Sequence, residues 1–179
     1  MSAANAPGRR EKPASGKYLT FFLGKETYGL EILQVKELIG YQDITGLPQA
    51  PMYVKGVINL RDTVIPIVDL RCRFGMPEIE PTEQTCIVVV QVNDSTIGLL
   101  VDRVSEVQDI GAKHIEGPPT VGRRAVDGFV RGISKAAGRV TLLLDIDCIV
   151  DEAAEFGGPA EGAGFEAEDE LDELIEMAL

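Results

Sequence analysis

The apolar residues of this chain fall in short runs rich in Val, Ile and Leu, separated by breaks that contain Gly, Asp or Asn. From residue 18 onward the runs form pairs, which is the pattern of β-hairpins. The paired runs are residues 18–23 with 28–32, 55–61 with 64–69, 85–92 with 96–101, and 129–134 with 139–144. The best helix candidate in the body is residues 147–156, with Asp145 or Asp147 as its N-cap. The pattern predicts a mainly β fold, either a barrel or a sandwich.

The second half of the body repeats the first. Residues 54–70 align with 130–146 at an offset of 76, and residues 28–38 align with 97–107 at an offset of 69. The matched pairs are Lys55 and Arg131, Gly56 and Gly132, Val64 and Val140, Asp69 and Asp145, Gly29 and Gly98, Val35 and Val104, and Glu37 and Glu106. Two similar units in the same order predict two small barrels that share a core. The alternative is a chance alignment of apolar strands.

Matched and unmatched positions of the repeat indicate different roles. A glycine at 56 and 132 allows a bulge or a close backbone approach within a strand. Asp69 and Asp145 end a strand where the chain turns toward a helix, which is a capping position. The hairpin tips differ, since one copy has Asn59-Leu-Arg-Asp62 and the other has Lys135-Ala-Ala-Gly138. A polar Asn and a multidentate Arg on one hairpin alone predict a recognition surface.

Charge is distributed unevenly along the 179 residues, whose formal net charge is −12. Residues 1–17 hold four bases and one acid, residues 18–156 hold thirteen bases and twenty acids, and residues 157–179 hold eight acids and no base. An acidic body argues against the chief rival class, a small barrel that binds nucleic acid. No run approaches the roughly 18 apolar residues that span a bilayer, so we expect no direct membrane insertion.

Residues suited to catalysis or metal binding are few. His114 is the single His, cannot form a two-histidine metal motif, and is expected in a polar loop. Asp145 and Asp147 could bind Mg²⁺ from one strand face, but helix capping is the commoner role. Three cysteines without CxxC spacing are expected to be small buried thiols in a reducing compartment: Cys72, Cys86 and Cys148. The sequence therefore predicts no enzyme, no cofactor and no metal.

The first hairpin of the repeat carries a specific motif, Lys55-Gly-Val-Ile-Asn-Leu-Arg61 followed by Val64-Ile-Pro-Ile-Val-Asp-Leu70. Together with Tyr28-Gly29 and Val35-Lys-Glu-Leu38 upstream, this motif resembles the CheW family of chemotaxis coupling proteins over about residues 18–156. The resemblance implies two small five-stranded β-barrels on a common hydrophobic core, with a C-terminal helix.

The resemblance also implies a non-enzymatic, cytoplasmic adaptor recruited to membrane-associated arrays. Its partners would be the regulatory domain of a CheA-type histidine kinase and the cytoplasmic tips of methyl-accepting chemoreceptors. Receptor state would then control kinase autophosphorylation. A coupling protein for a pilus or gliding pathway is the alternative within the family.

Carried over by motif, the receptor- and kinase-binding residues lie on one strand and one hairpin: Val35, Glu37, Leu38, Asn59, Arg61 and Asp62. Candidate apolar walls of the groove between the barrels are Ile32, Val101 and Val104. The family usually has Gly after the hairpin Arg, whereas this chain has Asp62. Its carboxylate either pairs with Arg61 or changes the partner preference.

The body, residues 18–156 with halves of about 18–80 and 81–156, has an appendage at each end. Residues 1–17 are expected to be a disordered tail, and residues 157–164 read as a flexible linker. In residues 165–179 four apolar side chains recur at helical spacing: Leu171, Leu174, Ile175 and Ala178. This segment is either a frayed acidic tail or an amphipathic helix that docks on an extra partner.

Overall fold

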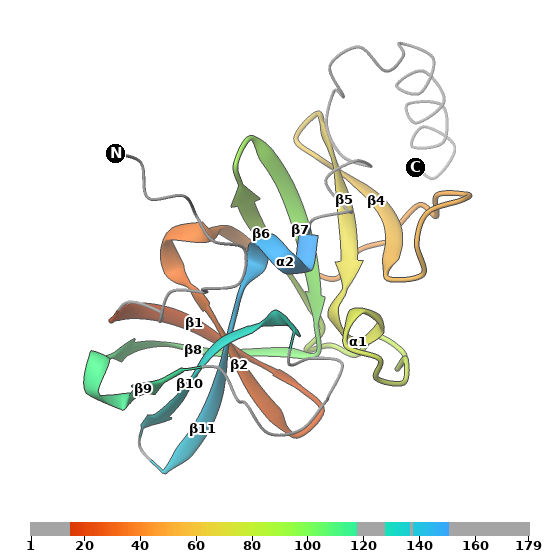
Figure 1. Cartoon of the computed structure of the whole chain (residues 1–179). Helices are drawn as coiled ribbons and strands as arrows, with labels where there is room; N and C mark the ends of the chain where they lie inside the picture. The colour runs from red at the N-terminus through yellow and green to blue at the C-terminus, as the bar shows by residue number, and fades with distance from the viewer. Residues whose placement is uncertain (1–14, 118–127, 137, 151–179) are drawn as a thin grey trace.

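A computed structural model describes residues 15–117, 128–136 and 138–150, in which the strands form two sheets (Figure 1). Sheet A has the order β8-β1-β2-β11-β10-β9 and sheet B the order β3-β6-β7-β5-β4. The strands are β1 (Gly16–Leu23), β2 (Glu26–Glu31), β3 (Val35–Gly40), β4 (Val54–Leu60), β5 (Thr63–Asp69), β6 (Cys86–Val92), β7 (Ser95–Val101), β8 (Arg103–Ile110), β9 (Ile115–Glu116), β10 (Val130–Ala136) and β11 (Arg139–Leu144). The helices are α1 (Leu70–Arg73) and α2 (Ile146–Val150), and the 3₁₀ turns are η1 (Ile32–Gln34) and η2 (Ala112–His114).

All four hairpins predicted from the apolar runs are present as antiparallel pairs: β1–β2, β4–β5, β6–β7 and β10–β11. The mainly β fold is therefore confirmed. The pairing of apolar runs did not predict β3 or β8. These edge strands carry many polar residues, and nearly all of their residues are exposed or half-buried. β1 begins at Gly16, so the ordered body starts two residues earlier than the predicted boundary.

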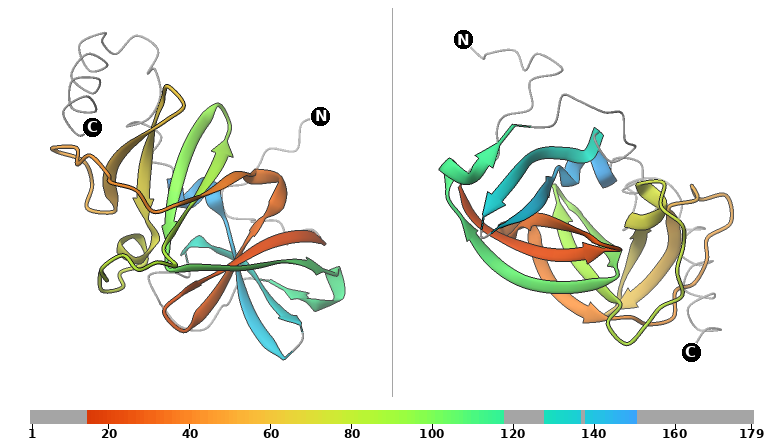
Figure 2. Two further views of the ribbon diagram at one scale, coloured as in Figure 1. Left: turned by 180° about the vertical axis from the view of Figure 1, so that it is seen from behind. Right: turned by 90° about the horizontal axis from the view of Figure 1, so that it is seen from below.

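Each sheet takes strands from both halves of the sequence. The chain passes from sheet A to sheet B through η1, and it returns at Asp102 between β7 and β8. A boundary near residue 80 therefore does not separate two units in space. Figure 2 shows that the strands curve, while β3 and β4 remain the edges of sheet B in the pairing order. Closure into barrels stays a prediction.

The repeat is visible in the register of the strands. Gly29 on β2 pairs with Leu143 on β11, and Gly98 on β7 pairs with Ile67 on β5, each in a parallel contact. A Cβ at Gly98 would lie 2.5 Å from Ile67 Cδ1 and 2.8 Å from Ile87 Cγ2. At these crossings a side chain on β2 or β7 would displace the neighbouring strand, which explains a glycine in both copies.

The core consists of one large cluster between the sheets and a smaller one within each sheet. The large cluster contains buried residues of both sheets, including Phe21, Tyr28, Val88 and Leu99. Five aliphatic residues fill sheet B: Ile58, Ile65, Ile67, Ile87 and Val89. Four residues fill sheet A: Tyr18, Ile110, Ile115 and Leu143. The shared hydrophobic core predicted for the two units is therefore confirmed.

A charged pair also ties the two sheets together. Arg71 on α1 donates two hydrogen bonds to Asp102, at 2.7 Å from Nε to Oδ1 and 2.5 Å from an Nη to Oδ2. The backbone N–H of Gly24, in the β1–β2 turn, donates to the same carboxylate at 2.7 Å. Burial opposes ionisation of Asp102, but these hydrogen bonds outweigh it and lower its pKa. The pair joins the β7–β8 crossing to elements of both sheets.

Both repeated aspartates cap helices. The Asp69 carboxylate accepts from the backbone N–H of Arg71 at 2.9 Å, and that of Asp145 accepts from Asp147 at 3.1 Å. Of the helix predicted at 147–156, the structure describes α2 up to Val150. The predicted linker at 157–164 and acidic segment at 165–179 lie outside the described residues, as does most of the N-terminal tail. Among the described residues no helix is long and apolar enough to cross a membrane.

Candidate functional site

The β4–β5 hairpin turns through Arg61 and Asp62, and both residues have positive φ angles, 47° and 66°. Leu60 pairs with Thr63 on either side, so the loop has two residues. Positive φ at both loop positions is the signature of a type I′ turn, whose twist matches that of the flanking strands. The turn holds Arg61 at the tip of the hairpin with 74% of its side chain exposed.

Arg61 forms an ion pair with Glu37 on β3, in which the guanidinium donates to the carboxylate. β3 and β4 are the two edge strands of sheet B. In a flat sheet the four spacings of about 4.8 Å would place these edges roughly 19 Å apart. Direct contact between the two side chains therefore requires sheet B to curl strongly.

An open hollow of about 370 Å³ lies beside this ion pair. Its lining comes from all five strands of sheet B: Lys36, Glu37, Leu60, Arg61, Thr63, Ile65, Val89 and Thr96. We call this the coupling hollow. It combines two exposed cations, a carboxylate and small apolar surfaces, which suits recognition of another protein.

Of the six predicted contact residues, the structure brings Glu37 and Arg61 into direct contact. Leu38 is 45% exposed on β3, whereas Val35 is half-buried against the large core cluster. Asn59 is exposed near the end of β4. The pairing of Glu37 with Arg61 was not predicted, because their separation of 24 residues carries no local signal.

Asp62 does not pair with Arg61 in the described contacts, since the carboxylate bound to Arg61 is that of Glu37. The structure therefore does not support the expectation that Asp62 orients Arg61 through an ion pair. The repeat places Gly138 at the equivalent turn position, with φ of 73° and open space around its Cα. Asp62 thus holds a left-handed conformation that the other copy assigns to glycine.

Replacing Asp62 by Gly is expected to raise the free energy of unfolding by about 0.5–1 kcal/mol. Relief of left-handed strain of about 1–2 kcal/mol is partly offset by the greater entropy of glycine in the unfolded chain. The reverse substitution in the other copy, Gly138→Asp, is expected to lower the free energy of unfolding by a similar amount. Urea denaturation measures both variants, and unchanged stability in both would contradict this account of the turn.

Three candidate groove residues lie where the chain crosses between the sheets. Ile32 in η1 marks one crossing, while Val101 and Val104 flank the other. Val101 is only 1% exposed and is part of the core, so it does not present its side chain to a partner in this structure. Ile32 and Val104 are half-buried against the same cluster. Leu33, which was not predicted, is 95% exposed beside Ile32 and is the more accessible apolar residue of this junction.

Gly56 and Gly132 both lie at a register shift in their strands, between residues 54 and 56 and between residues 130 and 132. Gly56 has a φ of 148°, and a Cβ at this position would collide with the carbonyl oxygen of Thr45. Thr45 and Val57 exchange two backbone hydrogen bonds, at 2.8 and 2.9 Å. Gly56 therefore lets the chain after β3 pair with the outer edge of β4.

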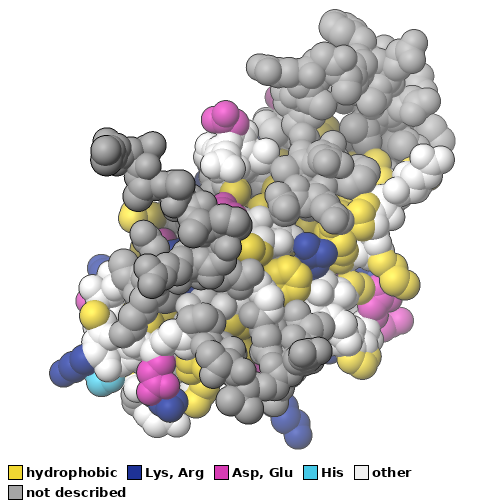
Figure 3. Space-filling view, viewed as in Figure 1, with side chains coloured by type: hydrophobic (Ala, Val, Ile, Leu, Met, Phe, Trp, Pro, Cys, Tyr) yellow, Lys and Arg dark blue, Asp and Glu magenta, His cyan; other side chains and the backbone are white. Residues whose placement is uncertain are grey.

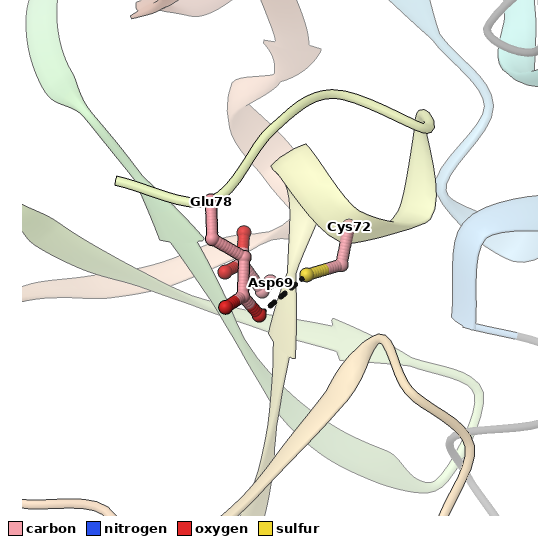
Figure 4. Close-up of side chains that lie close together, drawn as sticks. All are labelled: Asp69, Cys72 and Glu78. Atoms are coloured by element: carbon pink, nitrogen blue, oxygen red, sulfur yellow. Dashed lines mark hydrogen bonds between the residues drawn. The ribbon is translucent and has the colours of Figure 1, made fainter. Parts of the chain in front are cut away.

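A second cluster joins the side chains of Asp69, Cys72 and Glu78, whose ligand-type atoms lie within 4.8 Å of one another (Figure 4). The ammonium group of Lys55 contacts both carboxylates, at 3.8 Å from Asp69, and supplies the positive charge of the cluster. The repeat reproduces the Asp–Cys arrangement, since the Cys148 thiol donates to Asp145 at 3.4 Å. The cluster is thus explained by helix capping and an ion pair.

The thiol of Cys72 is a poor nucleophile in this cluster. Burial and a hydrogen bond to Glu78, at 3.1 Å, raise its pKa from 9.0 to about 12, against the opposing charge of Lys55. A raised pKa keeps the thiol protonated, so its contribution to folding is complete below pH 9 and is lost as pH rises toward 12. All three cysteines are thiols rather than disulfides, and they are half-buried rather than fully buried as predicted.

Alkylation of Cys72 by iodoacetamide at pH 8 is therefore expected to be about 100-fold or more slower in the folded chain than in urea, because thiolate is the reactive form. Peptide mass spectrometry measures the rate at each cysteine. The variant Glu78→Gln removes the carboxylate and is expected to speed the reaction. Equal rates in the folded and unfolded chain would contradict this environment for Cys72.

The surface charge does not favour a nucleic-acid interface. In Figure 3 the described lysine and arginine side chains on this face are scattered and form no continuous band. Several described bases are also engaged by carboxylates, including Arg71 with Asp102 and Arg131 with Glu31 at 3.4 Å. Phosphate binding needs free, aligned cations. The adjacent bases Arg123 and Arg124, a small basic cluster in the sequence, lie outside the described residues.

The sequence matches a known protein family and is similar to several known proteins. Residues 17–154 match the model of the CheW-like domain family. The chain is 37% identical over 131 residues to a chemotaxis protein CheW of Rhizobium meliloti, which covers 73% of this chain and 84% of that protein. It is 31% identical over 136 residues to a chemotaxis protein CheW of Bacillus subtilis, covering 76% of this chain and 87% of that protein.

A solved structure shows the same fold. The crystal structure of the scaffolding protein TtCheW from Thermoanaerobacter tengcongensis superposes with a TM-score of 0.72 at 32% sequence identity. The match covers 79% of this chain and 97% of that protein. The similarity therefore extends over nearly the whole of the described body.

Proposed function

The chain belongs to the family of CheW-like domains, and from this premise we propose that it is the adaptor that joins a CheA-type histidine kinase to the cytoplasmic tips of chemoreceptors. It acts in chemotaxis signalling as a coupling scaffold. An adaptor functions by binding, so its functional residues are those whose side chains contact the partner proteins. Its place is the membrane-associated receptor array, reached through these contacts.

One observation carries this proposal: the ion pair between Arg61 and Glu37 at the coupling hollow. The pair joins Glu37 on the edge strand β3 to Arg61 in the turn after the other edge strand, β4, and Arg61 is mostly exposed, so a partner can reach it. The equivalent hairpin of the other copy has Ala at position 137 in place of Arg61. The fold therefore does not require this arginine, and its presence supports a role in recognition.

A second surface lies at the crossing between the sheets formed by η1, where Leu33 is exposed next to Ile32. Exposed apolar residues over a rigid core suit the apolar face of a helix, such as the helical hairpin at a receptor tip. The crossing and the coupling hollow involve different residues, so one rigid body can hold two partners at once. This is the requirement for an adaptor.

Control of the kinase follows from differential affinity. Each contact of about 1,000 Å² is weak by itself, and repetition in an array raises the effective concentration of every partner. A receptor changes the kinase only if its two signalling states bind the adaptor–kinase unit with different affinities. The scaffold thus transmits receptor state without a chemical step of its own.

Co-sedimentation with receptor signalling fragments on vesicles tests the proposal. The kinase is expected in the pellet only when receptor and adaptor are both present. Leu33→Asp is expected to reduce the adaptor in the pellet, whereas the exposed Met52→Asp should leave it unchanged. A kinase that pellets equally well without the chain would overturn the proposal.

A further inference from the structure

A second hollow, of about 630 Å³, opens at sheet A and has no role in the proposed coupling. It is formed by the ends of the β1–β2 and β10–β11 hairpins and the start of β8. Three of its residues are basic, Lys25, Arg103 and Arg139, and three are apolar, Phe22, Val140 and Leu142. We call this the basic hollow.

The three cations are available to a ligand. Among the described residues none of them forms an ion pair. The Arg103 guanidinium lies over the Phe22 ring at 4.4 Å from its centroid, which leaves its edge free to donate hydrogen bonds. The hollow contains one carboxylate, Glu26, which already accepts a hydrogen bond from the Tyr28 hydroxyl at 2.8 Å.

The internal repeat shows that the fold does not need these bases. By the same offsets, Lys25 corresponds to Asp94, Arg103 to Gln34 and Arg139 to Thr63. The three basic positions around this hollow thus correspond to one acidic and two uncharged residues at the equivalent positions of the repeat. The body as a whole is acidic, so composition alone does not explain this concentration of positive charge.

The apolar part of the hollow is also exposed. Val140 is 56% accessible, although it lies within a strand. A ligand that fits this hollow therefore has several negative charges next to a few apolar groups. An acidic amphipathic peptide has that chemistry, whereas a bare anion would leave the apolar wall uncovered.

Such a peptide is present in the chain itself. Residues 165–179 contain seven acids, no base, and apolar residues at helical spacing, among them Leu171, Leu174 and Ile175. The fifteen residues that follow Val150, up to Phe165, span up to about 50 Å when extended, which is enough to cross a domain of this size. Covalent attachment raises the effective concentration to about the millimolar range.

We propose that residues 165–179 dock in the basic hollow of the same molecule. The acidic side chains contact Lys25, Arg103 and Arg139, and the apolar side chains cover Val140 and Leu142. The tail is then an intramolecular competitor for any acidic partner segment that uses this end of sheet A. Because its attraction is largely electrostatic, docking weakens as salt concentration rises.

NMR spectroscopy of the full-length chain tests this proposal without any partner. The chain is compared with a full-length variant in which the seven acids of residues 165–179 are replaced by their amides. Amide resonances of the basic hollow are expected to differ between the two at low salt and to converge in 0.5 M NaCl. No difference, or differences centred elsewhere, would overturn the proposal, as would differences that grow with protein concentration.

A synthetic peptide of residues 165–179 provides the second measurement. It is expected to bind the amide variant saturably, and the native chain at least about tenfold more weakly, since the native tail competes. Adding Lys25→Glu, Arg103→Glu and Arg139→Glu to the amide variant is expected to abolish binding. The same charge change at three exposed lysines outside the hollow, Lys17, Lys36 and Lys113, serves as the matched control. If both triple variants lose peptide binding equally, the peptide is attracted to net charge alone, and the basic hollow is not its binding site.

Discussion

Arg61→Glu is expected to lower receptor-dependent kinase activity about tenfold or more, while the chain stays folded. The substitution places a second carboxylate opposite Glu37, so the ion pair at the coupling hollow becomes a repulsive contact. Arg61 is mostly exposed, and surface ion pairs contribute only about 0–1 kcal/mol to stability. A tenfold loss corresponds to about 1.4 kcal/mol of coupling free energy, which is the size expected when a contact to a partner is removed.

The repeat offers a matched control for this variant. Lys135 lies on the equivalent hairpin of sheet A and pairs with Glu116 at 3.3 Å, at a similarly exposed position. Lys135→Glu makes the same charge change on the equivalent hairpin, at the position that corresponds to Asn59. It is expected to leave receptor-dependent kinase activity within about twofold. Equal losses in both variants would mean that charge in general, rather than the coupling hollow, supports the activity.

Gly56→Ala is expected to destabilise the chain by about 3 kcal/mol or more. The new Cβ meets the carbonyl of Thr45, which is backbone and cannot rotate away, and the φ of 148° is unfavourable for alanine. Relief of the collision requires breaking the two hydrogen bonds between Thr45 and Val57. Because marginal domains are stable by only about 5–15 kcal/mol, the variant loses a large part of its stability.

Thermal and urea unfolding measure this effect, and Gly40→Ala is its control. Gly40 ends β3 with open space around it, so an added methyl group is expected to change stability by less than about 1 kcal/mol. The Gly56 variant is also expected to lose receptor-dependent activity, because it distorts β4, whose last residue Leu60 lines the coupling hollow. A Gly56→Ala chain as stable as the native one would contradict the close approach to Thr45.

The sequence predicted the hairpins well because each is local. The runs from 18 to 32 and from 85 to 101 combine β-branched residues with tight turns, so strand and partner are adjacent in the chain. β3 and β8 were not detected in this way, because an edge strand can be exposed and polar on much of its length. Their partners, β6 and β1, are also distant in sequence.

Local sequence patterns also could not predict that each sheet takes strands from both halves of the chain. A repeat indicates two similar units, but it does not say whether each unit pairs with itself or with the other. The parallel pairings of Gly29 with Leu143 and Gly98 with Ile67 decide that question, and both join residues from different halves. Only tertiary packing determines these contacts.

The candidate contact residues were predicted through the family motif, and the structure adds how two of them meet. Glu37 and Arg61 are 24 residues apart, and their pairing depends on the curl of a whole sheet. The exposed Leu33 was missed because a single leucine between two strands has no pattern. The unequal hairpin tips were the one internal signal, since the repeat lacks a counterpart of Arg61.

Kinase autophosphorylation measured with receptor-containing vesicles, with and without this chain, tests the central claim most directly. The account predicts that adding the chain raises kinase activity about tenfold or more and that receptor ligand then suppresses it, since the adaptor links receptor state to the kinase. Kinase activity that is equal with and without the folded chain, or that ignores the receptor ligand, would contradict it.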